Sequence, residues 1–157
     1  MESFLIVNET KAKLPSLPFF AIKKAVMGNG CNVSLVFASD AKLAKLNKIY
    51  RGKNGTTDIL SFPLSEKSGE IYISLKESAR QAENFGYKNS KKSKFIGFLF
   101  IHGLLHLKGY SHGSTMEHEE ARFVKKFRLS PFGVEKAKHT WQKKSRSVST
   151  SAHIKSK

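Results

Sequence analysis

Residues 91–107 constrain the fold more than any other part of this 157-residue chain. They form the longest helical candidate, and apolar side chains lie almost all round the predicted helix. Such a helix is usually buried at the centre of a domain. Its most apolar part, residues 95–107, contains His102 and His106 and is shorter than the roughly 20 apolar residues that cross a bilayer. With no export signal at the N-terminus, we expect a soluble cytoplasmic protein with no membrane partner.

The rest of the chain alternates between strand-like and helix-like segments. Alternating hydrophobicity and turn residues predict strands, and periodic apolar positions between caps and glycines predict helices. The order favours an α+β domain, in which a small mixed sheet of about four strands packs with five or six helices around a central helix. The predicted strands span 3–8, 31–38, 58–64 and 70–75, and the predicted helices 15–28, 40–50, 74–85, 91–107 and 114–129.

Three helix starts are predicted from capping residues. Asp40 is interpreted as an N-cap, because Asp accepts hydrogen bonds from the free N–H groups of the first turn. Ser74 and Ser114 are each followed three residues later by Glu, which is the spacing of a capping box. We therefore assign both serines to helix caps and not to catalysis.

The charge of the chain indicates a polyanionic partner. Lys and Arg number 28 against 12 Asp and Glu, which gives a net charge of +16. Such a chain attracts polyanions, and the charge alone leaves nucleic acid, the ribosome and an anionic membrane surface as candidates. From Lys136 onward there are seven Lys or Arg and no acidic residue. We expect a single metal-dependent hydrolase domain over 1–142 and a disordered basic tail over 143–157. The lone Cys31 excludes an intramolecular disulfide partner and a cysteine-based zinc cluster.

The segment HGLLHLKGYSH, residues 102–112, carries the strongest chemical signal. His102 and His106 are one helical turn apart, so both imidazoles can reach one metal ion. Gly109 can end the helix and turn the chain back, which brings His112 toward the same ion. Three histidine nitrogens suit Zn²⁺ and leave a fourth position open, as in catalytic rather than structural sites. Other divalent metals that bind imidazole remain alternatives.

A metal site of this kind does not by itself determine which reaction the protein catalyses. The same histidine spacing occurs in zinc peptidases, but these carry a glutamate directly after the first histidine as general base. Here that position is Gly103, which has no side chain. A third alternative is a non-catalytic module that binds the ribosome or RNA and whose metal is structural.

Residues 102–112 closely resemble the H-G-x-L-H-L-x-G-Y-D-H signature of the YbeY family of bacterial rRNA-maturation endoribonucleases. Two further segments are similar to that family, in the same order along the chain. One is Leu46-Asn47-x-x-Tyr50-Arg51 followed by TDILSFP at 57–63, and the other is GEIYIS at 69–74. The chain departs from the family pattern at Ser111, where Asp is usual, and at Thr56, where Pro is usual.

The resemblance implies a function and site residues. It implies Zn²⁺ bound by three histidines and a metal-dependent endoribonuclease that cleaves single-stranded RNA in 16S rRNA 3′-end maturation and ribosome quality control. The implied partners are ribosomal RNA and the small ribosomal subunit with its proteins. Arg51 and, through the metal, His106 are the catalytic candidates. Arg51 is also a candidate for contact with the RNA phosphates, as are Lys53 and Lys108, which adjoin the motifs.

Overall fold

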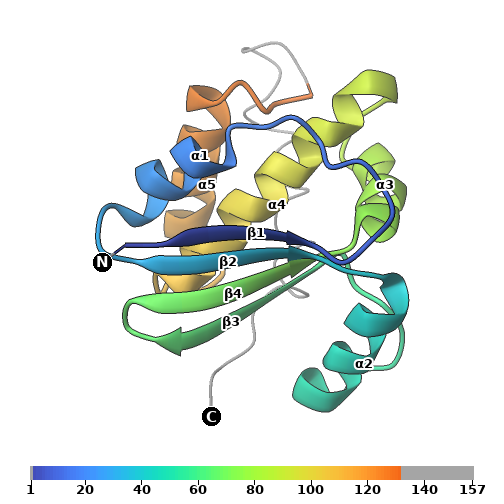
Figure 1. Ribbon diagram of the computed structural model, residues 1–157. Coiled ribbons are helices and arrows are strands. Elements are labelled where there is room, and N and C mark those ends of the chain that lie inside the picture. Colours follow the sequence, from blue (N-terminus) through green and yellow to red (C-terminus); the bar gives the residue numbers. More distant parts are fainter. Residues whose placement is uncertain (1, 132–157) are drawn as a thin grey trace.

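The computed structural model describes residues 2–131. Within them, four strands form one mixed sheet (Figure 1). The strand order is β1-β2-β4-β3, where β1 is Phe4–Asn8, β2 is Asn32–Phe37, β3 is Ile59–Ser65 and β4 is Ser68–Ile73. The pairs β1–β2 and β2–β4 are parallel, whereas β3 and β4 form an antiparallel hairpin. This confirms the predicted mixed sheet. The predicted boundary at 142 and the tail at 143–157 lie outside the described residues.

Within residues 2–131, five α-helices accompany the sheet, which agrees with the predicted α+β class. They are α1 (Phe19–Met27), α2 (Asp40–Arg51), α3 (Leu75–Asn84), α4 (Lys92–Leu107) and α5 (Ser114–Lys126), and a short 3-10 helix η1 (Asn89–Lys91) precedes α4. Helix α4 contacts β3 and β4 of the sheet as well as α1, α3 and α5. Every residue of α4 from Phe95 to His106 is buried, which explains why its sequence is apolar on all sides.

The sheet has a core on each face because side chains alternate along its strands. In β2, Val33, Leu35 and Phe37 join the large core that includes α4. The intervening Val36 joins a smaller core with Leu43 of α2. Helices α2 and α4 therefore pack against opposite faces of the sheet. Figure 1 shows α4 crossing the sheet on the side that also carries α1 and α5.

The predicted helix caps were right at one position and wrong at two. Ser74 caps α3, since its hydroxyl oxygen accepts a backbone N–H three residues on, at 3.0 Å. Asp40 is the first residue of α2, and the cap is Ser39. Ser114 is likewise the first residue of α5, and Gly113 holds the cap position without a side-chain hydrogen bond. In both errors the true cap lies one residue earlier, a shift that composition alone does not reveal.

Between residues 2 and 131 the structure has no helix that combines the length and the apolar character needed to cross a membrane.

Candidate metal centre

The last two turns of α4 and the turn after it bring three histidines together. His102 and His106 lie one turn apart on α4 and are buried. Gly109 adopts a φ of +103°, which L side chains rarely allow, and the N–H of Tyr110 donates to the carbonyl of residue 105 at 3.0 Å. This turn returns the chain so that the exposed His112 faces the other two. One candidate ligand atom from each histidine lies within 4.8 Å of the others.

The ring nitrogens show how the cluster can hold a cation. Nδ1 of His106 lies 3.0 Å from the carbonyl oxygen of Tyr110, which can only accept, so Nδ1 carries the proton. The neutral ring then bears a lone pair on Nε2. That atom faces Nε2 of His102 at 3.1 Å and Nε2 of His112 at 2.8 Å. One lone pair cannot accept both hydrogen bonds, whereas a cation among the three nitrogens is bound by all of them. The donor set therefore fits a metal ion.

A buried carboxyl group from α5 supports the first histidine. Oε1 of Glu120 lies 2.7 Å from Nδ1 of His102, and both side chains are almost fully buried. Burial raises the pKa of the Glu120 carboxyl to about 8, and the charge of Glu117 acts in the same direction. Within residues 2–131, the second oxygen of Glu120 has no hydrogen-bond partner.

Sequence reasoning assigned no role to Glu120. A signal was present, because Glu120 interrupts the buried stripe that Met116, Phe123 and Val124 form on α5. A carboxyl on the apolar face of a helix needs a partner. The partner itself, His102, lies 18 residues away and becomes visible only when α5 packs on α4.

The residue after the first histidine has no room for a catalytic base. A Cβ atom at Gly103 would lie 2.9 Å from Oγ of Ser61 and about as close to Ile59 and Ile71 of the sheet. The hydroxyl of Ser61 also donates to the carbonyl of Gly103, at 3.4 Å. A glutamate side chain at this position would need the helix to move off the sheet. The zinc-peptidase alternative therefore lacks both the residue and the space for it.

Arg51 is the last residue of α2, and a residue of the same helix holds its side chain. Its Nη1 donates to Oδ1 of Asn47 at 3.1 Å, and Gly52 ends the helix in the left-handed conformation with a φ of +65°. Partial burial lowers the pKa of Arg51, while the charge of Asp58 opposes that shift. Helix α2, which ends at Arg51, and helix α4, which carries the two buried histidines, pack on opposite faces of the sheet.

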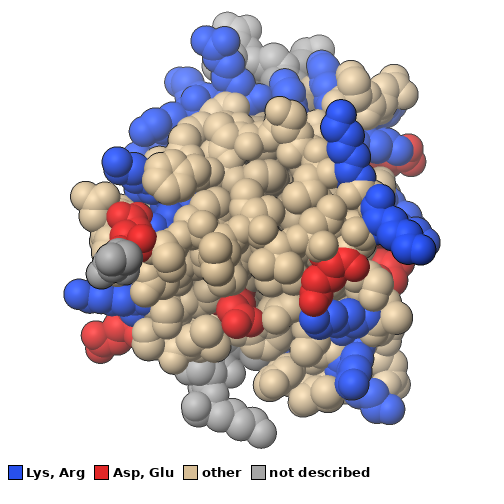
Figure 2. Space-filling view, viewed as in Figure 1, with Lys and Arg blue, Asp and Glu red and all other residues tan. Residues whose placement is uncertain are grey.

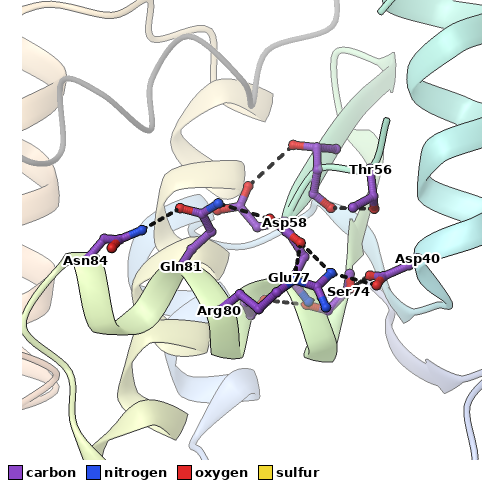
Figure 3. Close-up of polar contacts among 10 residues, drawn as sticks. Asp40, Thr56, Asp58, Ser74, Glu77, Arg80, Gln81 and Asn84 are labelled. Atoms are coloured by element: carbon purple, nitrogen blue, oxygen red, sulfur yellow. Dashed lines mark hydrogen bonds and ion pairs between the residues drawn. The ribbon is translucent and has the colours of Figure 1, made fainter. Parts of the chain in front are cut away.

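Asp58 lies beside α3 at the start of β3 (Figure 3). Burial raises the pKa of its carboxyl to about 6, and the charge of Glu77 adds to the effect. Asp40, the first residue of α2, joins that helix to α3: it accepts hydrogen bonds from the hydroxyl of Ser74 and, at 2.7 Å, from Arg80. The backbone N–H of Ser74 also donates to the carbonyl of Asp58 at 3.0 Å, which ties this network to the start of β3.

The two lysines predicted to contact RNA differ in their surroundings. Lys53 is exposed in the loop after α2. Nζ of Lys108 donates to the carbonyl of Val26 at 3.1 Å and so caps the end of α1. RNA contact by either lysine stays a prediction.

Comparison with known proteins agrees with these observations. The sequence model of the family described as "Endoribonuclease YbeY" matches residues 7–131. The chain is 30% identical over 151 residues to the endoribonuclease YbeY of Bacillus licheniformis and 31% identical over 152 residues to that of Bacillus subtilis. Each alignment covers 87% of this chain and 94% of the relative. The fold is similar to the solution structure of TM1509 from Thermotoga maritima, with a TM-score of 0.56 and 26% identity over 80% of this chain and 89% of that one. The chain belongs to the YbeY family of endoribonucleases.

Proposed function

We propose that this endoribonuclease cleaves single-stranded RNA at a metal centre formed by His102, His106 and His112. Its proposed substrate is the precursor of small-subunit (16S) rRNA near the 3′ end, in cytoplasmic rRNA maturation and ribosome quality control. The observation that carries the proposal is the convergence of three Nε2 atoms, in a chain whose family consists of endoribonucleases. The small ribosomal subunit and its proteins are the proposed partners.

Zn²⁺ is the proposed metal because the cluster offers only imidazole nitrogens. Such donors suit zinc at distances of about 2.0–2.1 Å, and hard cations such as Mg²⁺ prefer oxygen. Among residues 2–131, the candidate ligand group consists of the three histidines alone, which leaves a coordination position for water or phosphate. A bound zinc ion would act there as a Lewis acid toward the phosphodiester.

Arg51 is the proposed phosphate-binding residue. A guanidinium can bind two phosphate oxygens at once, and partial burial strengthens that attraction because less water competes. Its hydrogen bond to Asn47 limits the positions that the side chain can adopt. Figure 2 shows lysine and arginine side chains around the rim of one face, where they can attract the backbone of an RNA strand. Binding should therefore weaken as the salt concentration rises.

The test is cleavage of a precursor 16S rRNA 3′ fragment by zinc-loaded protein. We expect the wild type to cut it and His106→Ala not to cut it. The control is His118→Ala, which removes an exposed histidine of α5 outside the cluster. Equal cutting by His106→Ala would place the chemistry elsewhere. If the wild type binds the fragment and does not cut it, the non-catalytic module replaces the enzyme as the better interpretation.

A second pair of variants tests the arginine. Arg51→Lys keeps the charge and loses the paired N–H donors, so it should cut more slowly than the wild type and faster than Arg51→Ala. If Arg51→Ala cuts at the wild-type rate, the proposed role of Arg51 is wrong.

A further inference from the structure

Glu120 is buried where a carboxyl group does little for the stability of the fold. It is 1% exposed, and its neighbours on the inner face of α5 include Met116, Phe123 and Val124. Within the described residues its carboxyl makes one hydrogen bond, to His102, and the other oxygen has none. Burying a carboxyl with so few partners is unfavourable, and a hydrocarbon side chain at such a site is often equally stable or more stable. Packing alone therefore does not account for this residue.

The contact has the geometry that prepares an imidazole to bind a cation. Oε1 of Glu120 faces Nδ1 of His102 at 2.7 Å, and Nε2 of the same ring points at the histidine cluster. When the proton between Glu120 and His102 lies on Nδ1, Glu120 is a negatively charged carboxylate. Nε2 of the neutral ring then has a lone pair that can bind a cation. A carboxylate at Nδ1 also makes Nε2 a better electron donor. The contact thus orients the ring and gives its Nδ1–H an acceptor when Nε2 binds a cation.

His106 is held in the same way, but a different oxygen atom accepts the hydrogen bond from its Nδ1. Nδ1 of His106 lies 3.0 Å from the backbone carbonyl of Tyr110. Each buried histidine of the cluster thus has an oxygen atom behind Nδ1 and points Nε2 at the shared centre. The acceptor for His106 comes from the local turn, whereas the acceptor for His102 must be supplied by another helix.

We infer that Glu120 is a positioning residue for the metal centre, which holds His102 with its Nδ1 protonated and its Nε2 directed at the metal. The inference rests on the proposed function, because it assumes that the three histidines bind a metal ion. It assigns to α5 a part in the site beyond its packing on α4.

The test measures the affinity of the full chain for Zn²⁺ by competition with a chromophoric chelator. Glu120→Gln retains an acceptor without charge, and Glu120→Leu removes the acceptor. Loss of such outer partners typically weakens metal binding about 10–100-fold, so we expect a fall of that size for Glu120→Leu and a smaller one for Glu120→Gln. The matched control is Glu119→Gln, which removes one charge from the adjacent position, where the side chain pairs with Arg122.

Two further readouts separate positioning from folding. Without metal, the melting temperature of Glu120→Leu should equal or exceed that of the wild type, because the leucine joins the apolar stripe of α5. In the zinc-bound wild type, the Nδ1–H proton of His102 should resonate far downfield by NMR, and Glu120→Leu should shift it upfield. Zinc affinities of Glu120→Leu and Glu120→Gln within twofold of the wild type would overturn the inference. A wild type that binds no zinc would instead overturn the proposed metal centre.

Discussion

The guanidinium of Arg51 and the buried amide of Asn47 are joined one turn apart on α2, Nη1 to Oδ1 at 3.1 Å. Nδ2 of Asn47 donates in turn to the carbonyl of Gly55 at 3.0 Å. A side chain that is 3% exposed thus holds both the arginine and the glycine-rich loop that follows it. The position of Arg51 is set by the interior of the protein and not by its surface alone.

Replacing Asn47 should therefore affect both stability and RNA cleavage. In Asn47→Ala, two hydrogen bonds worth about 0.5–1.5 kcal/mol each are lost, so the free energy of unfolding should fall by about 1–3 kcal/mol. Cleavage should fall about tenfold or more, because a displaced charged group no longer meets the phosphate. Urea denaturation and single-turnover cleavage measure the two effects. The control is Asn54→Ala in the exposed loop, and wild-type cleavage by Asn47→Ala would contradict the prediction.

The turn at Gly109 should be essential for the metal centre. Its φ of +103° is unfavourable for alanine, so Gly109→Ala should lower the free energy of unfolding by about 1–3 kcal/mol. If the backbone relaxes, the carbonyl of Tyr110 leaves His106 and His112 moves away from the cluster. Zinc affinity should then fall more than tenfold, as measured by chelator competition. Ser111→Ala in the same turn is the control, and a Gly109→Ala protein with unchanged zinc affinity would refute this account of the turn.

Asp58 should make the protein less stable as the pH rises through about 6. Its pKa is raised from 3.8 to about 6 in the folded state, so between these values the folded state holds a proton that the unfolded state has released. The extra stability is present below pH 4 and is lost by pH 7, with a difference of about 3 kcal/mol. Urea denaturation between pH 4 and 7 should show this fall in the wild type relative to Asp58→Asn. Parallel pH profiles of the two proteins would show that Asp58 does not titrate in this range.

The features predicted correctly from sequence are those set by nearby residues. The spacing of His102 and His106 and the glycine after them define a cluster within eleven residues, so helix geometry sufficed to predict it. The alternating hydrophobicity of residues 31–38 likewise predicted strand β2. The Ser114 cap failed because a shift of one residue leaves the local pattern almost unchanged.

The features that sequence reasoning did not provide depend on distant packing. The order β1-β2-β4-β3 inserts the last strand of the hairpin beside β2, and no local pattern encodes that choice. The contact between His102 and Glu120 requires α5 to lie on α4. The packing of α2, which ends at Arg51, on the face of the sheet opposite α4 also depends on the path of the whole chain.

Metal binding should stabilise a protein that folds without it. The large core of α4, the sheet and the other helices consists of apolar side chains, and a domain of this size needs no structural metal. After treatment with a chelator, the far-UV circular dichroism should therefore remain that of the folded protein. Adding Zn²⁺ at about 100 times its dissociation constant should then stabilise the fold by about 2.7 kcal/mol and raise the melting temperature.

The variants of the cluster show whether this stabilisation comes from the proposed site. His106→Ala should melt at the same temperature with and without Zn²⁺, whereas His118→Ala should respond like the wild type. Unfolding of the wild type on removal of the metal would indicate a structural ion and favour the non-catalytic alternative. An equal rise in melting temperature for His106→Ala would show that Zn²⁺ binds elsewhere on the chain.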